Sequence, residues 1–313
     1  MTDDFVYHMK YVNNRIKRFT DMLPITHVHL IAPSYPPSEQ DVRLTKSYLE
    51  ALGMQVTVPP DLLGEDLLCA HKDEVRLTHL ERALHDPSAD VIWLLCGGYG
   101  LTRLAHKLFK IKKPQKEKLF IGFSDGTILH AFLNQTWNWP TLHGPCAIQV
   151  AKEKVGTQTI EATLHIAKKG LSRYILPTLT PLNRQARGIT SLSGTLVGGN
   201  LCLLESSLGT NWQLNPSYKI LFFEDIDERG YRIDRMLMHL EQANIFEDAK
   251  AIIFGNFERG NESDGTSLIF PVLQRFAENI HLPVFHLPEC GHGDENLPLP
   301  FNVHLNFAVK TME

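Results

Sequence analysis

The sequence predicts an α/β protein with two domains. Its 313 residues are enough for two hydrophobic cores of ordinary size. The first half alternates short apolar runs, typical of buried strands, with segments of helical periodicity, and this alternation indicates a parallel sheet. The second half has fewer such pairs and ends in short β segments, so it is expected to form a smaller, mixed α/β domain.

The first half is expected to contain four strands, each followed by a helix. The strands are expected at 27–32, 56–58, 91–95 and 119–123, and the helices at 38–52, 72–84, 101–109 and directly after 123. Ser38 suits the cap of the first helix and Gly53 its end. In a parallel sheet the loops at the carboxyl ends of the strands carry the chemistry. We therefore expect 96–100 and 124–126 to be neighbours in a Rossmann-like domain.

The predicted domain organisation has four parts. They are an N-terminal amphipathic extension at 1–25, an α/β domain at 26–150, a linker region at 151–187 and a C-terminal domain at 188–313. Beyond 150 we expect helices at 158–168, 231–243 and 268–280, strands at 218–223, 251–254 and 283–286, and short β segments within 297–309. The extension carries apolar residues along one helical face, which favours packing on its own domain or on a dimer partner. Docking at a membrane surface is the alternative, because the segment is also cationic.

Composition and charge narrow the class of protein. With 43% hydrophobic and 21% charged residues, the chain is expected to be soluble and globular. Its net charge of −4 and pI near 6.4 provide no basic field for nucleic acid. The sequence shows neither an apolar run of membrane-spanning length nor a secretory signal, so no integral membrane segment is expected. Its five scattered cysteines are typical of reduced thiols and predict a cytoplasmic protein.

The most informative segment surrounds Ser124. The apolar strand expected at 119–123 runs directly into this serine, with Gly122 and Gly126 on either side at the G-x-S-x-G spacing. A serine at such a strand-to-helix turn is exposed on a tight bend near backbone N–H groups, which suits a nucleophile. The spacing alone does not establish catalysis, because a serine also needs a base and an acid that orients the base.

Two loops of the second half resemble active-site loops. Glu224 is the first acid after a buried apolar strand, and His292 stands between two glycines that leave the backbone free to orient the imidazole. Asp225 and Glu228 follow Glu224 in the same loop, where they suit a turn cap and a solvated position. The glycine-rich segment 97–100 matches neither the dinucleotide nor the P-loop spacing, so nucleotide binding is disfavoured.

At eight places the chain resembles a single family. In chain order these are Leu30-Ile-Ala-Pro-Ser34, Gly97-Gly-Tyr-Gly100, Gly122-Phe-Ser-Asp125, Gly144-Pro145, Gly198-Gly-Asn200, Glu224-Asp225 with Tyr231-Arg-Ile-Asp-Arg235, Ile252-Ile-Phe-Gly255, and Gly291-His292 with Leu297-Pro-Leu299. Each motif is weak alone, but eight in the family's order over residues 26–307 are a strong signal. The chain is similar to the serine L,D-carboxypeptidases, the LD-carboxypeptidase A family, which includes the microcin-immunity peptidases.

The resemblance implies a Ser-Glu-His triad. It assigns Ser124 as the nucleophile, His292 as the general base and then acid, and Glu224 as the residue that orients the imidazole. It also implies an oxyanion hole made by the backbone N–H groups of Gly98 and Asp125. Because the nucleophile belongs to one domain and its two partners to the other, the active site is expected in the cleft between the domains.

The reaction implied by the resemblance is release of the terminal D-alanine from a cytoplasmic murein tetrapeptide, a step of peptidoglycan recycling. It proceeds through an acyl-enzyme and needs no metal or other cofactor. The expected partners are this small peptide and, as a homodimer, a second copy of the chain. Candidate substrate contacts are Tyr99, His143 and Arg235, although His143 also fits a packed loop position and Arg235 a surface ion pair or a dimer contact.

Departures from the family pattern leave other readings open. Cys96 stands where the family commonly has arginine, which removes a cation from the cleft, and the thiol is itself a rival nucleophile. Pro300 replaces the glycine of the usual Leu-Pro-Leu-Gly, and the N-terminal extension is unusually long. The alternative functions are an immunity-type peptidase that cleaves a peptidyl-nucleotide antibiotic, and a catalytically silent ligand-binding protein with the same fold.

Overall fold

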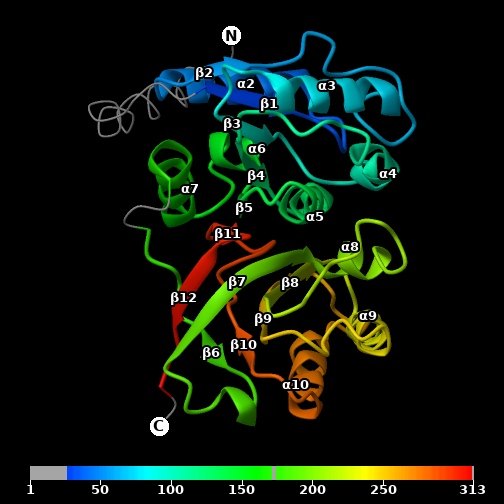
Figure 1. Cartoon of the computed structure of the whole chain (residues 1–313), viewed down its shortest axis with the longest axis vertical. Helices are drawn as coiled ribbons and strands as arrows, with labels where there is room; N and C mark the ends of the chain where they lie inside the picture. Colours follow the sequence, from blue (N-terminus) through cyan, green and yellow to red (C-terminus); the bar gives the residue numbers. More distant parts are fainter. Residues whose placement is uncertain (1–26, 171–173, 312–313) are drawn as a thin grey trace.

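The computed structural model describes residues 27–170 and 174–311. The predicted extension at 1–25 lies outside the described residues. The rest of the chain forms two sheets, one above the other in Figure 1, and each sheet has six strands in the described residues. The two-domain α/β class is confirmed, and the second sheet has as many strands as the first.

The first sheet has the strand order β2-β1-β3-β4-β5-β11. Its first five strands are mutually parallel, and β11 pairs antiparallel with β5. These strands are β1 (His27–Ile31), β2 (Gln55–Thr57), β3 (Val91–Leu94), β4 (Leu119–Gly122), β5 (Thr141–His143) and β11 (Leu299–Phe301). Apart from β11, this is a doubly wound sheet in which the order reverses between β1 and β3, and ligands bind at the carboxyl ends beside such a reversal.

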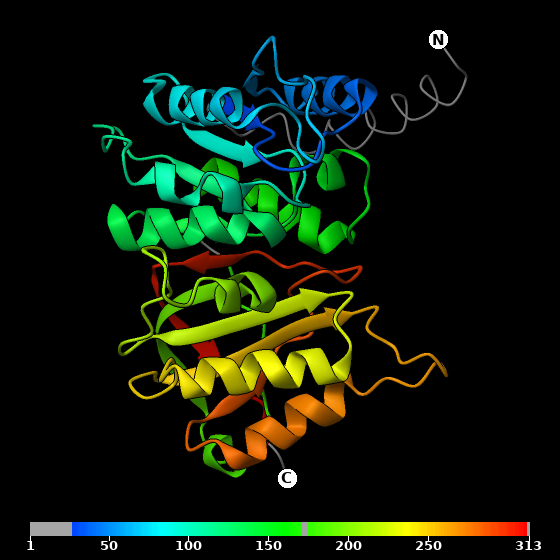
Figure 2. The ribbon, with the colours of Figure 1, turned by 90° about the vertical axis from the view of Figure 1, so that its right-hand side faces the viewer.

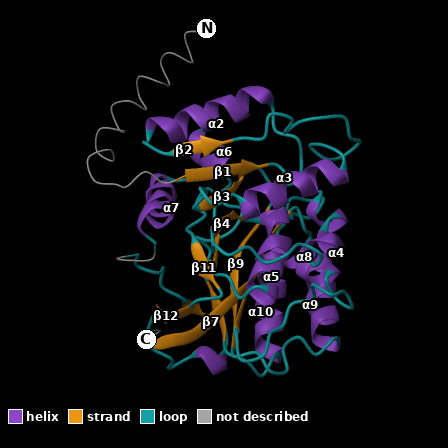
Figure 3. Cartoon of the chain, turned by 45° about the horizontal axis from the view of Figure 1, so that its top comes forward, coloured by secondary structure: helices purple, strands orange, loops and turns teal. Residues whose placement is uncertain are grey.

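Helices cover both faces of the first sheet, because alternate strand residues are buried on opposite sides. Leu30 and Trp93 pack with α2 (Glu39–Ala51), α6 (Ala147–Ala151) and α7 (Thr157–Lys169). Their neighbours Ile31 and Leu94 pack with α3 (Asp73–His85), α4 (Ala105–Leu108) and α5 (Thr127–Thr136). In Figure 3, α2 and α5 lie on either side of these strands.

The second sheet has the strand order β12-β7-β8-β9-β10-β6. The four central strands are parallel, and the two edge strands are antiparallel to their neighbours. The strands are β6 (Thr180–Pro181), β7 (Ser191–Asn200), β8 (Ile220–Ile226), β9 (Ala251–Glu258), β10 (Val284–His286) and β12 (His304–Ala308). Parallel central strands again bring their carboxyl ends to one edge.

The second domain covers its sheet differently on the two faces. Helices α8 (Leu201–Ser206), α9 (Gly230–Gln242) and α10 (Ile269–Asn279) share a core with one face, and Figure 2 shows α9 and α10 along the sheet. The other face packs against β11, where Leu299 and Phe301 meet Phe222 and Ile253. The strand β11 therefore belongs to the first sheet by hydrogen bonding and to the second domain's core by packing.

Three segments pack or pair across the predicted parts of the chain. Within the predicted linker region at 151–187, α7 packs in the first domain's core and β6 joins the second sheet. Within the predicted C-terminal domain at 188–313, β11 joins the first sheet. Sequence patterns cannot show such long-range pairing, since each segment looks the same in either domain.

Candidate active site

Ser124 lies on a strained bend at the carboxyl end of β4. It begins a short 3₁₀ helix, Ser124–Gly126, that leads into α5, and its φ of 57° is in the left-handed region, which a residue other than glycine rarely adopts. The side chain is partly exposed. A bend that holds a serine outward in this way is the geometry of a nucleophile in α/β hydrolases.

The glycine-rich loop after β3 lies directly against this serine, as the sequence predicts. A Cβ placed on Gly97 would come within 3.0 Å of the Cβ and Oγ atoms of Ser124 and 3.9 Å of the backbone nitrogen of Asp125. Any side chain here would press on the nucleophile, so the close approach favours glycine. Gly98, the next residue of this loop, stays a predicted donor of the oxyanion hole.

Glu224 and His292 form a buried pair in the second domain. The Nδ1 atom of His292 lies 2.5 Å from Oε2 of Glu224, whose side chain is fully buried on β8. His292 stands in the loop between β10 and β11, after Gly291, which has a φ of 137° and whose added Cβ would lie 3.1 Å from the Cβ of Glu224. Glycine is favoured before the histidine because both its backbone conformation and the space it leaves are needed.

An aromatic contact joins this pair to the nucleophile's bend. Phe123, the residue before Ser124, has its ring centroid 4.6 Å from that of His292. At the same boundary, the Thr127 hydroxyl accepts a hydrogen bond of 3.0 Å from the backbone N–H of Asn200 at the end of β7. The carboxyl ends of both sheets therefore meet where the three predicted catalytic residues lie.

The electrostatics favour a charged acid beside the imidazole. Burial alone would raise the pKa of Glu224, but His292 and His143 outweigh it and lower this pKa to about 2. Burial likewise opposes charge on His292, and the nearby Glu224 outweighs it, so the pKa of His292 lies above its ordinary value. Glu224 is thus an anion at neutral pH, suited to orient the imidazole and to stabilise the imidazolium that forms when the base takes a proton.

Asp125 fixes the geometry on the first sheet through its side chain. Its Oδ2 accepts hydrogen bonds from the Ser34 hydroxyl at 2.5 Å and from the backbone N–H of Leu101 at 2.9 Å. Burial raises the pKa of Asp125 to about 6 against these two contacts. The carboxyl group therefore ties the nucleophile's bend to the loops after β1 and β3.

Asp225 has the matching place on the second sheet. It accepts hydrogen bonds from the Asn200 side-chain amide at 2.7 Å and from the backbone N–H of Cys202 at 2.9 Å. Burial, assisted by the charge of Glu224, raises its pKa to about 7. Ser34 and Asn200 lie in two of the eight motifs, but no role was predicted for them. The available signal was a polar side chain just after β1 and at the last position of β7.

Arg76 supports the same loops, a role that no sequence pattern predicted. This buried side chain on α3 donates to the carbonyl oxygens of His71 at 2.8 Å, Gly100 at 3.1 Å and Pro33, and it pairs with Asp73. A guanidinium can satisfy several carbonyls at once because its donors form a planar fork. An arginine on an amphipathic helix is ordinarily a surface residue, so local sequence carries no signal for this role.

Comparison with known proteins shows the family. A family model described as the LD-carboxypeptidase N-terminal domain matches residues 28–144, and one described as the LD-carboxypeptidase C-terminal domain matches 193–307. The chain belongs to the LD-carboxypeptidase family. It is therefore a hydrolase of the peptidase class, and the resemblance drawn from the eight motifs is confirmed.

Three known proteins are similar to this chain to different degrees. A Rickettsia conorii protein named "Putative carboxypeptidase" is 38% identical, over 88% of this chain and 86% of its own. The crystal structure of muramoyltetrapeptide carboxypeptidase from Oxalobacter formigenes is 28% identical, with a TM-score of 0.73 and coverage of 88% and 92%. The microcin C7 self-immunity protein MccF, in a structure with aspartyl sulfamoyl adenosine, has a TM-score of 0.75 at 20% identity, with coverage of 91% and 95%. This last likeness shows a shared fold alone.

The three predicted substrate contacts of this LD-carboxypeptidase lie in different environments. Tyr99 is 43% exposed on the glycine-rich loop, as a substrate contact requires. His143 is fully buried and faces Glu224, so it does not line an open surface. Arg235 is exposed on α9 with its guanidinium 5.8 Å from the Tyr231 ring, and among the described residues no interaction joins it to Ser124, Glu224 or His292.

Cys96, at the family's usual arginine position, is a poor nucleophile. Its Sγ donates to the Tyr35 carbonyl oxygen at 3.1 Å. Burial, with smaller contributions from Asp125 and Asp41, raises the pKa of the thiol to about 12. Because the thiolate is the reactive form, Cys96 is disfavoured as a rival to Ser124.

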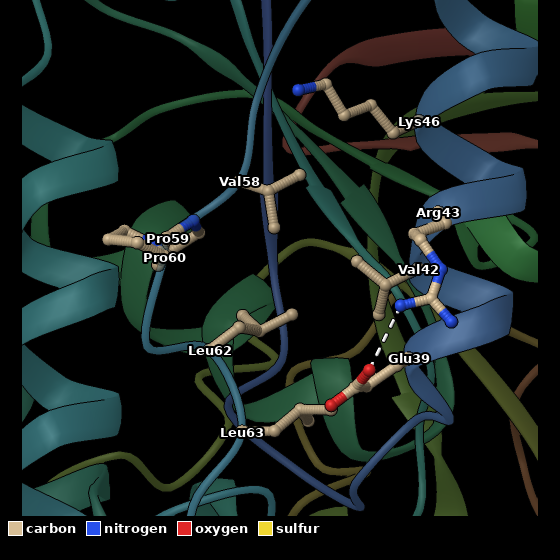
Figure 4. A pocket seen from close by; sticks show the side chains of 9 residues that line it. All are labelled: Glu39, Val42, Arg43, Lys46, Val58, Pro59, Pro60, Leu62 and Leu63. Atoms are coloured by element: carbon tan, nitrogen blue, oxygen red, sulfur yellow. Dashed lines mark hydrogen bonds and ion pairs between the residues drawn. The ribbon is translucent and has the colours of Figure 1, made fainter.

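A separate pocket lies in the first domain. It has a volume of about 430 Å³ and lies between α2 and the segment after β2 (Figure 4). Its lining residues are Glu39, Val42, Arg43, Lys46, Val58, Pro59, Pro60, Leu62 and Leu63. None belongs to the predicted active site. Within 27–170 and 174–311, no cluster of three acidic, histidine or cysteine side chains is arranged to hold a metal, and no helix there could span a membrane.

Proposed function

We propose that this chain is a serine L,D-carboxypeptidase with Ser124, His292 and Glu224 as its triad. One observation carries the proposal: the Glu224–His292 pair of the second domain lies against Phe123, at the bend that exposes Ser124. A base oriented by a buried acid, beside a serine on a strained bend, is the arrangement by which serine hydrolases activate the hydroxyl.

The proposed reaction has two halves. In the first, His292 accepts the Ser124 proton while Oγ attacks the carbonyl carbon of the scissile amide, and the N–H groups of Gly98 and Asp125 stabilise the oxyanion. His292 then donates that proton to the leaving amine, and the C–N bond breaks to leave an acyl-enzyme. In the second, His292 takes a proton from water, which attacks the ester, and returns it to Ser124.

The proposed substrate is a murein tetrapeptide that loses its terminal D-alanine. Support comes from the family and from the similarity to the muramoyltetrapeptide carboxypeptidase of Oxalobacter formigenes. We further propose a cytoplasmic role in peptidoglycan recycling, which suits the five unpaired cysteines. The homodimer stays a prediction, and light scattering tests whether the particle has the chain mass of 35.5 kDa or twice that mass.

The test is mass-spectrometric turnover of L-Ala-γ-D-Glu-meso-diaminopimelyl-D-Ala by the native protein and a Ser124→Ala variant. We expect D-alanine from the native protein, and a rate reduced at least about a thousandfold in the variant. Equal release by both proteins would remove Ser124 from the nucleophile's role. Absence of release from either would refute the murein substrate.

Cleavage of a peptidyl nucleotide is the second candidate. Tyr35 and Tyr99 are 59% and 43% exposed beside the glycine-rich loop, and aromatic faces of this kind can stack on a nucleobase. A Cβ on Gly98 would lie 2.5 Å from the Cβ of Tyr35, so this tyrosine adjoins the proposed oxyanion hole. Incubation with aspartyl sulfamoyl adenosine in the same assay distinguishes the candidates, since only the immunity-type activity would release the free nucleoside sulfamate.

A further inference from the structure

His143 belongs to the first sheet, but its side chain faces a residue of the second sheet. It is the last residue of β5 and pairs in register with Gly122 on β4, two positions before Ser124. Its imidazole extends toward Glu224 on β8 of the other sheet, with Nε2 3.8 Å from Oε1. The strand beside the nucleophile's strand therefore reaches the buried acid of the opposite domain.

Four aromatic rings lie close to this imidazole. Its ring centroid lies 5.1 Å from Phe222, 5.3 Å from Phe301, 5.9 Å from Phe123 and 6.0 Å from His130. The neighbouring His130 is engaged elsewhere, through the Thr141 hydroxyl and the Gly122 carbonyl, and burial lowers its pKa to about 3. His130 is therefore neutral, and in the described residues Glu224 is the charged group that faces His143.

His143 and Glu224 face each other with atoms that lack hydrogen-bond partners among the described residues. Neither ring nitrogen of His143 has a hydrogen-bond partner among the described residues, and the same holds for Oε1 of Glu224. The other carboxylate oxygen, Oε2, is taken by His292. A buried polar group without a partner is costly, and an aromatic cage would accept phenylalanine at no such cost. An interaction with the unpartnered Oε1 of Glu224 is therefore the best explanation for a histidine at position 143.

We propose that His143 is a positioning residue that couples the two halves of the triad. It holds Glu224 through Oε1, the carboxylate oxygen that His292 does not contact, and because its own strand pairs with the nucleophile's strand, it fixes the acid and base relative to Ser124. Only a small movement would convert the 3.8 Å approach into a hydrogen bond. This inference rests on the proposed function, since it assigns a partner to the same triad.

The test uses a fluorophosphonate probe, which labels an activated serine whatever the natural substrate is. In the full chain, His143→Phe keeps an aromatic ring and removes the nitrogens, whereas His143→Gln keeps a donor. We expect His143→Phe to slow Ser124 labelling at least tenfold without lowering the thermal midpoint, and His143→Gln to recover part of the rate. His29→Gln, a buried histidine on β1 beside Asp86, serves as the matched control and should label at the native rate.

A second comparison separates positioning from a packing role. In a Glu224→Gln background, where the acid's charge is already lost, we expect His143→Gln and His143→Phe to cause no further loss. Two results would overturn the inference. One is native-rate labelling of the His143→Phe variant, and the other is a double variant whose labelling rate falls by the product of the two single-variant reductions. Should His143→Phe fail to fold, the His143→Gln and Glu224→Gln pair provides the same comparison. Native protein that does not label would instead refute the Ser124 assignment itself, and the inference with it.

Discussion

At the carboxyl ends of both β4 and β8, a predicted catalytic residue is followed by a buried aspartate. The two catalytic residues differ in their exposure to solvent. On β4, Ser124 precedes the buried Asp125, and on β8, Glu224 precedes the buried Asp225. Each aspartate accepts a hydrogen bond from a side chain at or just beyond the carboxyl end of another strand of its sheet, and one from a backbone N–H at the start of a short helix. Yet Ser124 is partly exposed on a bend with positive φ, whereas Glu224 lies fully buried within its strand.

This difference follows from what each residue has to do. A nucleophile must reach substrate, and the bend carries its hydroxyl out of the sheet. An acid that orients a histidine must keep its charge away from water, because burial strengthens its attraction to the imidazole. The aspartates then supply the rigidity that both sites need, each by tying its strand end to an adjacent loop.

Removal of the Glu224 charge should have the largest effect on activity. We expect Glu224→Gln to lower kcat by about a thousandfold, because the imidazole loses its orienting anion. Glu228→Gln is the matched control, as it removes the next glutamate in chain order, which pairs with Arg232, and it should leave kcat within about twofold. A comparable loss in both variants would refute the assignment of Glu224.

The same variant should change the pH profile in a defined direction. Activity requires neutral His292, and Glu224 raises its pKa, so the acidic limb of kcat/KM is expected above the ordinary histidine value. Without that charge, burial remains and lowers the pKa, so the limb should move to lower pH. A limb that stays in place in Glu224→Gln would show that His292 does not titrate in this profile.

Asp225 should make stability depend on pH. Its pKa is about 7 in the folded protein and near the ordinary aspartate value when unfolded, so its protonated form favours the fold. This contribution is complete at pH values below the unfolded pKa and is lost as the pH rises through about 7. Between pH 5 and 8 we expect the native free energy of unfolding to fall by about 2 kcal/mol relative to Asp225→Asn.

Denaturant titrations at several pH values measure that difference. Asp227→Asn is the control, because this neighbouring aspartate is exposed and paired with Arg259, and it should keep the native pH dependence. A difference between native protein and Asp225→Asn that is constant from pH 5 to 8 would contradict a raised pKa for Asp225.

The smallest effect is expected from Cys96→Ser. The thiol contacts the Tyr35 carbonyl and has a raised pKa, and a serine hydroxyl can donate to the same oxygen. We expect kcat within about twofold of the native value, measured with the substrate that proves active. A loss of more than tenfold would give Cys96 a direct part in catalysis and weaken the contrast between the two strand ends.

Sequence patterns predicted those helices and strands that are determined by residues adjacent in the chain. The helix expected at 38–52 is observed at Glu39–Ala51, with Ser38 accepting a hydrogen bond from the backbone N–H of Asp41 at its start. The strand expected at 119–123, just before Ser124, is observed at Leu119–Gly122, and it was predicted equally well because an apolar run and a glycine pair determine it. By contrast, β5 was missed because it has only three residues, and β7 because three glycines obscure its strand pattern until β8 and β12 pair with it.

The sequence by itself determined the α/β class, the family and the three residues offered as a triad. These depend on residue order along one chain, where hydrophobic period, glycine spacing and motif order can be read directly. Only the tertiary structure decided that β11 joins the first sheet, that Arg76 holds the glycine-rich loop, and that His143 turns inward to Glu224. Each of these depends on which distant segments pack together, and burial, not local propensity, sets that arrangement.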